Sequence, residues 1–243
     1  MALRDSLVSW WELNETGGTR EDAHGSYDLT DYNTVGYGTG KQGNCADLEA
    51  SNSEYFARSS DCLGLSATGD LSIGFWIKFE TSGATPQNFF SFNIQNGSDD
   101  KQLSADIGVA GSNIVRFMEG NEVGSITNAS WTPTVGTWYY ISFTYKYNTA
   151  STGMNFYVNG VLIASGSSTS TYVSGTVASF TLGALTFGSG LPPYGRYIDG
   201  LLDEVGVWSR VLSQAEIYQL YNGGAGIPYS ATSTFIPRVS FIM

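Results

Sequence analysis

The sequence predicts an all-β protein, a two-sheet antiparallel sandwich with one short helix near its C-terminus. Only 14% of the 243 residues are charged and 30 are glycine, a composition typical of many short strands joined by turns. Several stretches alternate apolar and polar residues, as half-buried strands do. With 42% hydrophobic residues the chain can form one sizeable core, and all-β domains of about 200–250 residues are often single.

Alternation and turn signals place the strands along the chain. Residues 71–80 carry apolar side chains at every second position, which is typical of a long strand with one face on the core. The pair Asn159-Gly160 between two apolar runs is the strongest local hairpin signal. Residues 166–178 and 188–197 are expected as loops because they are rich in Ser, Thr, Gly or Pro. The expected strands cover residues 7–13, 27–32, 71–80, 88–95, 102–109, 113–119, 123–127, 137–146, 154–165, 179–186 and 200–208.

The late strand over residues 200–208 carries two carboxylates. A carboxylate in register with buried valines is costly unless it is paired, hydrogen-bonded or bound to a metal, and Asp203 is in that position. The period of two assigns one face to Leu201, Asp203, Val205 and Val207, and the other to Leu202, Glu204, Gly206 and Trp208.

The short helix is expected directly after this strand. Ser213 and Glu216 form the S-x-x-E pattern of a capping box, in which each residue satisfies an N–H at the helix start. Gly223 and Gly224 predict the end of the helix. Its apolar stripe consists of Ile217, Leu220 and Tyr221.

Four segments together carry a resemblance to a known family. They are WELNETGGTREDAHG (11–25), KQGNCADLEASNSEYFA (41–57), the pair TWYYISFTYK (137–146) with YVNGVL (157–162), and DEVGVWSRVLSQAEI (203–217). The chain from about residue 7 to 224 thereby resembles the laminin-G-like, concanavalin A-like jelly-roll domains. The resemblance implies a jelly-roll β-sandwich that a short helix closes.

The resemblance also implies a structural calcium ion. In such domains the aspartate near the glycine of the opening segment, here Asp22, commonly helps to hold calcium beside the carboxylate of the late strand, here Asp203. Calcium takes six to eight oxygen ligands, and backbone carbonyls of the 23–27 loop, such as that of Gly25, are expected to add to the set. Glu204 is a weaker candidate because it is assigned to the opposite strand face. In the alternative, Asp22 caps a turn and Asp203 accepts hydrogen bonds from that turn.

Catalysis is not expected. Glycosidases of related fold use a Glu-x-Asp-x-x-Glu strand to place two carboxylates on one face, and no glutamate here has an aspartate two residues later. The single histidine, His24, lies in a Gly-flanked loop, and no nucleophile elbow or phosphate-binding loop is present. Cys45 and Cys62 with one histidine do not make a zinc site of the usual spacing. Whether these cysteines pair is open, and the reduced state is favoured.

Glycan binding is the favoured activity, through aromatic rings and polar side chains on loops. The candidates are Tyr194, Arg196 and Tyr197, with Trp131 as an outlying member. An aromatic ring can cover the apolar face of a sugar while an arginine bonds its hydroxyl groups. The alternative for each ring is simple packing, since sandwich cores use aromatic side chains heavily.

The charge balance excludes some partners. Eleven Lys and Arg stand against 22 Asp and Glu, a net charge of −11, whereas binding to nucleic acid phosphates needs a basic surface. The acidity suits solubility or affinity for a cation. No run of 18 apolar residues is present, so no membrane span is expected.

The chain is expected to form one domain over residues 1–224 and an extended apolar C-terminal arm over residues 225–243. Pro228 and Pro237 break any helix in the arm, which is expected to pack on its own domain or on a neighbouring subunit. The N-terminus lacks the pattern of a secretory signal, so synthesis in the cytosol is expected. These features favour a non-catalytic accessory protein on a virion surface, such as a phage capsid-decoration or tail protein, that adheres to glycans. The alternatives are a free-standing or secreted bacterial carbohydrate-binding lectin in an extracellular setting, and a glycosidase or lyase with unusual residues.

Overall fold

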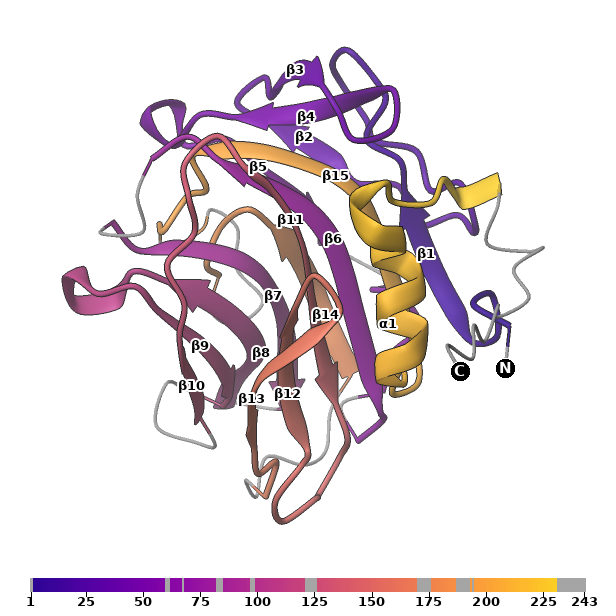
Figure 1. Ribbon diagram of the computed structural model, residues 1–243, viewed down its shortest axis with the longest axis vertical. Coiled ribbons are helices and arrows are strands. Elements are labelled where there is room, and N and C mark those ends of the chain that lie inside the picture. Colours follow the sequence, from indigo (N-terminus) through magenta and orange to yellow (C-terminus); the bar gives the residue numbers. More distant parts are fainter. Residues whose placement is uncertain are drawn as a thin grey trace, which may run out of the picture.

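The computed structural model describes residues 2–59, 62–66, 68–81, 85–96, 99–120, 126–169, 176–186, 193 and 195–230. Two antiparallel sheets face each other in a sandwich (Figure 1), as the sequence predicts. The eight-stranded sheet has the order β13 (Val161–Gly166), β12 (Met154–Val158), β11 (Trp138–Tyr145), β6 (Leu71–Phe79), β15 (Gly200–Trp208), β4 (Asn44–Leu48) and β3 (Gly36–Thr39), with β1 (Leu7–Trp11) also paired to β15. The seven-stranded sheet has the order β10 (Ile126–Ser130), β9 (Ile114–Glu119), β8 (Asp99–Ile107), β7 (Gln87–Asn96), β14 (Thr176–Leu182), β5 (Tyr55–Arg58) and β2 (Thr30–Tyr32).

The space between the two sheets is filled mainly by aromatic side chains. Phe143 of β11 packs against Phe90 of β7 and Phe117 of β9, with ring centroids 5.3 Å and 5.1 Å apart. Alternating residues of β6 and β11 point into this core, which confirms the alternation in the sequence of these strands. Residues between them therefore lie on the outer face of one sheet or the other.

The α-helix of the described residues, α1 (Gln214–Tyr221), lies over part of the outer face of the eight-stranded sheet, as Figure 1 shows. Ile217 and Leu220 of the helix pack on a second apolar cluster that includes Trp10, Trp76 and Trp208 from β1, β6 and β15. The predicted capping box is present, because Ser213 and Glu216 each accept a hydrogen bond from the other's backbone N–H. Short 3-10 helices lie at Ala50–Asn52, Val109–Gly111 and Asn222–Gly224.

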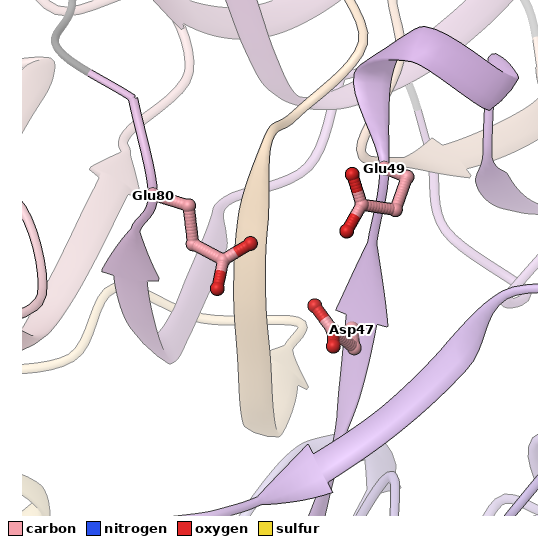
Figure 2. A group of neighbouring side chains, drawn as sticks. All are labelled: Asp47, Glu49 and Glu80. Atoms are coloured by element: carbon pink, nitrogen blue, oxygen red, sulfur yellow. The ribbon is translucent and has the colours of Figure 1, made fainter.

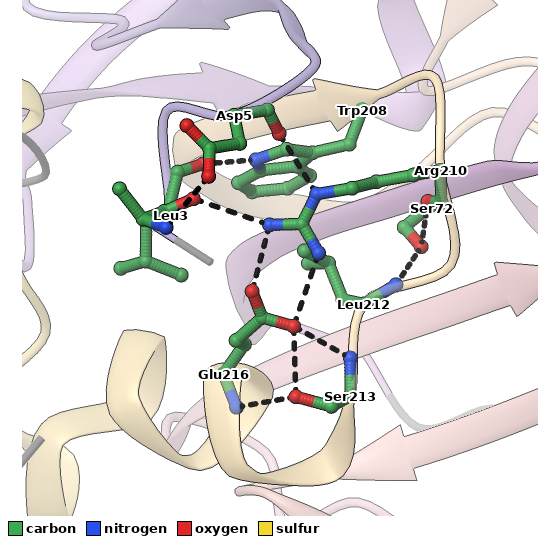
Figure 3. Close-up of polar contacts among 9 residues, drawn as sticks. Leu3, Asp5, Ser72, Trp208, Arg210, Leu212, Ser213 and Glu216 are labelled. Atoms are coloured by element: carbon green, nitrogen blue, oxygen red, sulfur yellow. Dashed lines mark hydrogen bonds and ion pairs between the residues drawn. The ribbon is translucent and has the colours of Figure 1, made fainter.

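Arg210 ties the helix to the N-terminal segment (Figure 3). Its guanidinium donates to both carboxylate oxygens of Glu216, at 2.7 Å and 3.0 Å, and its Nε donates to the carbonyl of Asp5 at 2.8 Å. The indole of Trp208 donates to the carbonyl of Leu3 at 2.7 Å. Residues 208–216, which belong to the fourth family-like segment, thus connect the last strand and the helix and bind both to the start of the chain.

A β-bulge in β15 corrects one prediction. Leu202 and Val205 both belong to the core between the sheets although they are three residues apart. The pairing of β15 with β6 shifts by one residue between Asp203 and Gly206, and Glu204 has a φ of 51°. Asp203 and Glu204 therefore both lie outside the core between the sheets, so their predicted assignment to opposite faces is wrong, and Asp203 does not share a face with Val205.

The first residues of the expected C-terminal arm pack on their own domain. Ile227 joins the cluster under the helix, and the ring of Tyr229 lies 6.2 Å from that of Trp10. The side chain of Arg4 donates to the carbonyl of Tyr229 and its guanidinium lies over the tyrosine ring. Residues 231–243, the remainder of the arm, lie outside the described residues.

Two further observations bear on the sequence predictions. No disulfide joins Cys45 and Cys62, which are both buried. In the part of the chain that the structure describes, no helix is long and apolar enough to cross a membrane.

Candidate functional site

Asp22 is held in a closed set of hydrogen bonds. Its Oδ1 accepts from the backbone N–H groups of Trp10 and His24, each at 3.0 Å. Its Oδ2 accepts from the hydroxyl of Ser9 at 2.9 Å and the N–H of Tyr27 at 3.1 Å. A carboxylate has about four lone-pair positions, so these four donors leave Asp22 poorly suited to a calcium ion. This arrangement matches the turn-capping alternative for Asp22.

The structure brings Asp22 together with Gly25 but not with Asp203. A Cβ on Gly25 would lie 2.8 Å from Oδ2 of Asp22, so only glycine fits there without movement. Asp22 pairs with Trp11, which in turn pairs with Val205 of β15, so β1 stands between the two carboxylates. The calcium site on Asp22 and Asp203 stays a prediction, and the donors that fill Asp22 argue against that residue as a ligand.

Asp203 of β15 belongs to a different hydrogen-bond network, in which the turn between β3 and β4 supplies the donors. Its Oδ2 accepts from the N–H groups of Lys41 and Gln42 at 2.6 Å and 3.0 Å, while the buried Oδ1 has no partner. Burial raises the pKa of Asp203 to about 7, and the backbone N–H groups of Gln42, Lys41 and Glu204 oppose this shift. The turn that donates to Asp203 is therefore the 40–43 turn, and not the turn of Asp22 that the alternative reading named.

Glu204, the next residue of β15, forms a buried acidic pair with Asp203. The indole N–H of Trp10 donates to its Oε2 at 2.5 Å, and its Oε1 has no partner. Burial raises the pKa of Glu204 to about 9, and the charge of Asp203 adds to the shift. Burial also raises the pKa of Tyr140, with a further contribution from Glu204. The raised pKa values favour the protonated form of both carboxyl groups, and a calcium ion would have to displace these protons.

A cluster of three carboxylates that was not predicted from the sequence lies at the end of the same sheet. Asp47 and Glu49 come from β4 and its end, and Glu80 follows β6, with β15 between them (Figure 2). One carboxylate oxygen from each residue lies within 4.8 Å of one oxygen of the other two. Burial and neighbouring carboxylates raise the pKa of Glu49 and of Glu80. Only the strand order makes these residues neighbours, so no local sequence pattern reveals the cluster.

The outer face of the seven-stranded sheet positions Arg196, one of the predicted glycan-binding residues. Its Nη1 donates to Oδ2 of Asp106 at 2.7 Å. Arg116 of β9 also bonds Asp106, with Nε to Oδ1 at 2.9 Å and Nη2 to Oδ2 at 2.6 Å. The side chain of Asp106 is fully buried, whereas those of the arginines are 17% and 18% exposed. Asp106 thus anchors two arginines at the border with solvent.

Tyr197 lies on the same face, in a group of three tyrosines. Its ring is 6.2 Å from that of Tyr55, which stacks on Tyr32 with ring centroids 4.6 Å apart. Tyr32 and Tyr197 are half-buried. Burial raises the pKa of Tyr55 to about 12. The sequence predicted Arg196 and Tyr197, but not Asp106 or Tyr55, which hold them.

Trp131, the outlying predicted glycan-binding residue, packs in a different place. The ring of Trp131 packs edge-on against Phe79, Tyr139 and Phe156, which is the packing alternative. Tyr194 lies outside the described residues.

Between the arginines and the tyrosines the face is lined with buried neutral polar groups. The amide of Asn93 donates to the hydroxyls of Ser179, at 2.8 Å, and of Thr186. Oδ1 of Asn93 and the hydroxyl of Ser104 have no partner. The members of this row are Ser91, Asn93, Gln102, Ser104, Ser179 and Thr181.

The sequence matches the model of a known protein family. Residues 51–218 match the model of the concanavalin A-like lectin/glucanases superfamily, Laminin_G_3. The chain belongs to this superfamily. The resemblance drawn from the four sequence segments, and the jelly-roll sandwich it implied, are therefore confirmed. No sequence among the curated proteins matches the chain.

Solved structures of the superfamily fold include carbohydrate-binding and carbohydrate-processing proteins. Domain 4 of AbnA, a GH43 extracellular arabinanase from Geobacillus stearothermophilus in complex with arabinotriose, is 20% identical with a TM-score of 0.63, over 88% of this chain and 97% of that domain. Trypanosoma rangeli sialidase in complex with 2,3-difluorosialic acid is 14% identical with a TM-score of 0.64, over 92% of this chain and 34% of the enzyme. The binding domain of botulinum neurotoxin DC in complex with SialylT is 15% identical with a TM-score of 0.64, over 91% of this chain and 52% of that one.

These likenesses show the fold alone, because the identities are low. This chain spans about a third of the sialidase and about half of the toxin fragment. It covers nearly the whole of the arabinanase domain.

Proposed function

We propose that this chain is a non-catalytic carbohydrate-binding module of the concanavalin A-like superfamily. The observation that carries the proposal is the placement of Arg196 and Tyr197 at the border of one sheet face. Asp106 anchors the arginine and Tyr55 packs against the tyrosine. A pre-positioned guanidinium and a half-buried ring supply the two contacts that sugars need, hydrogen bonds to hydroxyls and cover for an apolar face.

The carboxylates among the described side chains of this face support a binding role. Glycoside hydrolysis normally uses two carboxyl groups about 5–10 Å apart. Among the described side chains on the outer face of β7, β8 and β9, Asp106 is the one carboxylate, and two arginines engage it. Glu119 at the end of β9 points to the other side of the sheet, because its carboxylate accepts a hydrogen bond from the hydroxyl of Tyr145, which belongs to the core.

A glycan array followed by calorimetry tests the proposal, with arabino-oligosaccharides and sialylated oligosaccharides in the panel. Replacing Tyr197 by alanine is expected to weaken binding about tenfold, since an aromatic contact contributes about 0.5–1.5 kcal/mol beyond its buried area and about 1.4 kcal/mol is a factor of ten. Tyr37→Ala is the matched control, because Tyr37 is 55% exposed on β3 of the other sheet. Equal losses in both variants, or no binding to any glycan, would refute the assignment.

The non-catalytic part of the proposal has its own test. The wild-type protein is incubated with each bound oligosaccharide, and the release of reducing ends is followed. No release is expected. Release that is lost in Asp106→Asn would establish an enzyme instead.

The virion setting and the free-standing or secreted lectin remain alternative settings for this module. The described part of the C-terminal arm, up to Ser230, packs on its own domain. Comparing the molar mass in solution of the full chain with that of a chain ending at Ser230 tests whether the remaining residues join subunits. A loss of mass beyond the deleted residues would favour assembly on a particle, and an unchanged monomer would favour the lectin.

A further inference from the structure

A small pocket lies at one end of the sandwich, and its lining contains neither Arg196 nor Tyr197. The end of β9, the start of β6 and the end of β11 contribute Glu119, Leu71 and Tyr145. The segment before β6 borders the pocket with Leu65 and Asp70. Most of the lining is apolar, and the cavity has a volume of about 30 Å³ and opens partly to solvent.

Glu119 is the unusual group in this pocket. The residue is only 4% exposed, its Oε1 accepts from the hydroxyl of Tyr145 at 2.7 Å, and its Oε2 has no partner. The second carboxylate of the lining, Asp70, accepts from the N–H of Tyr147. Among the described residues of the lining there is no lysine, arginine or histidine. A buried carboxylate with no positive partner is costly, so the pocket favours a cation that brings hydrogen-bond donors.

The volume of the pocket and the residues of its lining restrict the class of ligand that it can bind. A cavity of about 150 Å³ is known to take benzene and a single water needs about 10–15 Å³, so this cavity takes a chain end and not a ring. Calcium is a poor fit because it needs six to eight oxygens. A hydrated alkali ion is a poor fit to apolar walls such as Leu65 and Leu71. An ammonium group on an alkyl chain matches both the carboxylate and the walls.

We infer that this pocket binds the end of a primary alkylammonium ion, with the ammonium on Oε2 of Glu119 and the alkyl chain against Leu65, Leu71 and Val177. The site is independent of the proposed glycan site. The same chemistry is present in a free alkylamine and in a lysine side chain. The two sources differ in what must remain outside the pocket mouth.

The test is a titration of the full chain with labelled Leu and Val methyl groups, followed by NMR at constant ionic strength. The probes are n-butylammonium, the neutral n-butanol, and N-acetyl-lysine methylamide as the lysine source. We expect n-butylammonium to shift the methyls of Leu71 and Val177 saturably, with a Kd at least tenfold lower than that of n-butanol. Binding of the lysine amide with a similar Kd assigns the pocket to lysine side chains, and its failure assigns it to free amines.

Two variants separate the pocket charge from the general acidity of the protein. Glu119→Gln is expected to raise the Kd for n-butylammonium at least tenfold, whereas Glu80→Gln, the same charge change at an exposed position outside the pocket, is expected to change it less than twofold. An equal effect of both variants would overturn the inference. Equal binding of n-butanol and n-butylammonium, or no saturable shift in the wild type, would overturn it without reference to any variant.

Discussion

Replacing Glu204 by glutamine is expected to make the stability of the sandwich less sensitive to rising pH. Glu204 is 2% exposed, and in the folded chain burial, with the charge of Asp203, raises its pKa to about 9. In the unfolded chain the group titrates near 4.5. Because the folded-state pKa is the higher one, the contribution of Glu204 is fully present below about pH 4.5 and is lost as the pH rises through about 9.

The magnitude follows from proton linkage. Between about pH 5 and 9 the folded chain keeps the proton of Glu204 and the unfolded chain has lost it, so each pH unit removes up to about 1.4 kcal/mol from the free energy of unfolding. Glutamine is neutral in both states, and its oxygen can still accept from the indole of Trp10. The difference in unfolding free energy between Glu204→Gln and wild type is therefore expected to grow by about 1 kcal/mol per pH unit.

Urea unfolding followed by tryptophan fluorescence at pH 5, 6, 7 and 8, with a chelator present, measures this difference. Trp10 and Trp208 are buried beside the site, which makes their emission sensitive to unfolding. Glu21→Gln, at an exposed position, is the control and is expected to follow the wild type. Parallel curves for Glu204→Gln and wild type over this range would refute the buried, protonated state of Glu204.

Three further predictions concern stability and the metal. Arg210→Met removes both hydrogen bonds to the carboxylate of Glu216 and is expected to lower the free energy of unfolding by about 3 kcal/mol. This loss corresponds to a Tm lower by about 6–12 °C. A loss of unfolding free energy below about 1 kcal/mol would contradict the prediction. Gly206→Ala would place a Cβ 2.5 Å from the Trp208 ring and is expected to cost about 1–3 kcal/mol in urea unfolding, so unchanged stability would show that the ring can move. Because hydrogen bonds fill Asp22, calcium is expected to leave Tm unchanged relative to a chelator, and a rise that Asp203→Ala abolishes would support the site implied by the family resemblance.

Local patterns were sufficient for most of the fold. The alternation in residues 71–80 predicts β6, because a strand between a core and an outer layer places successive side chains on opposite faces. The spacing of Ser213 and Glu216 predicts the start of α1, since a capping box is completed within four residues. The resemblance of four segments then gave the jelly-roll arrangement that the family comparison confirms.

Only part of the candidate site could be predicted from the sequence. Arg196 and Tyr197 were predicted because loop aromatic and arginine residues suit sugars, but the residues that hold them are far away in the chain. Asp106 is 90 positions from Arg196. Trp131 has the same residue chemistry as a sugar platform and packs against three core rings instead, a difference that no local pattern distinguishes.

The sequence alone determined the strand and helix periods, the helix cap and the membership of the superfamily, because each of these depends on residues that are close in the chain or on whole recognisable segments. The tertiary structure decided the rest. The bulge at Glu204 turns two successive carboxylates out of the core, because β15 must stay paired with β6 on both sides of the extra residue. The pocket at Glu119 forms where the start of β6 meets the ends of β9 and β11. Contacts between such distant strands leave no trace in a pattern that repeats every second residue.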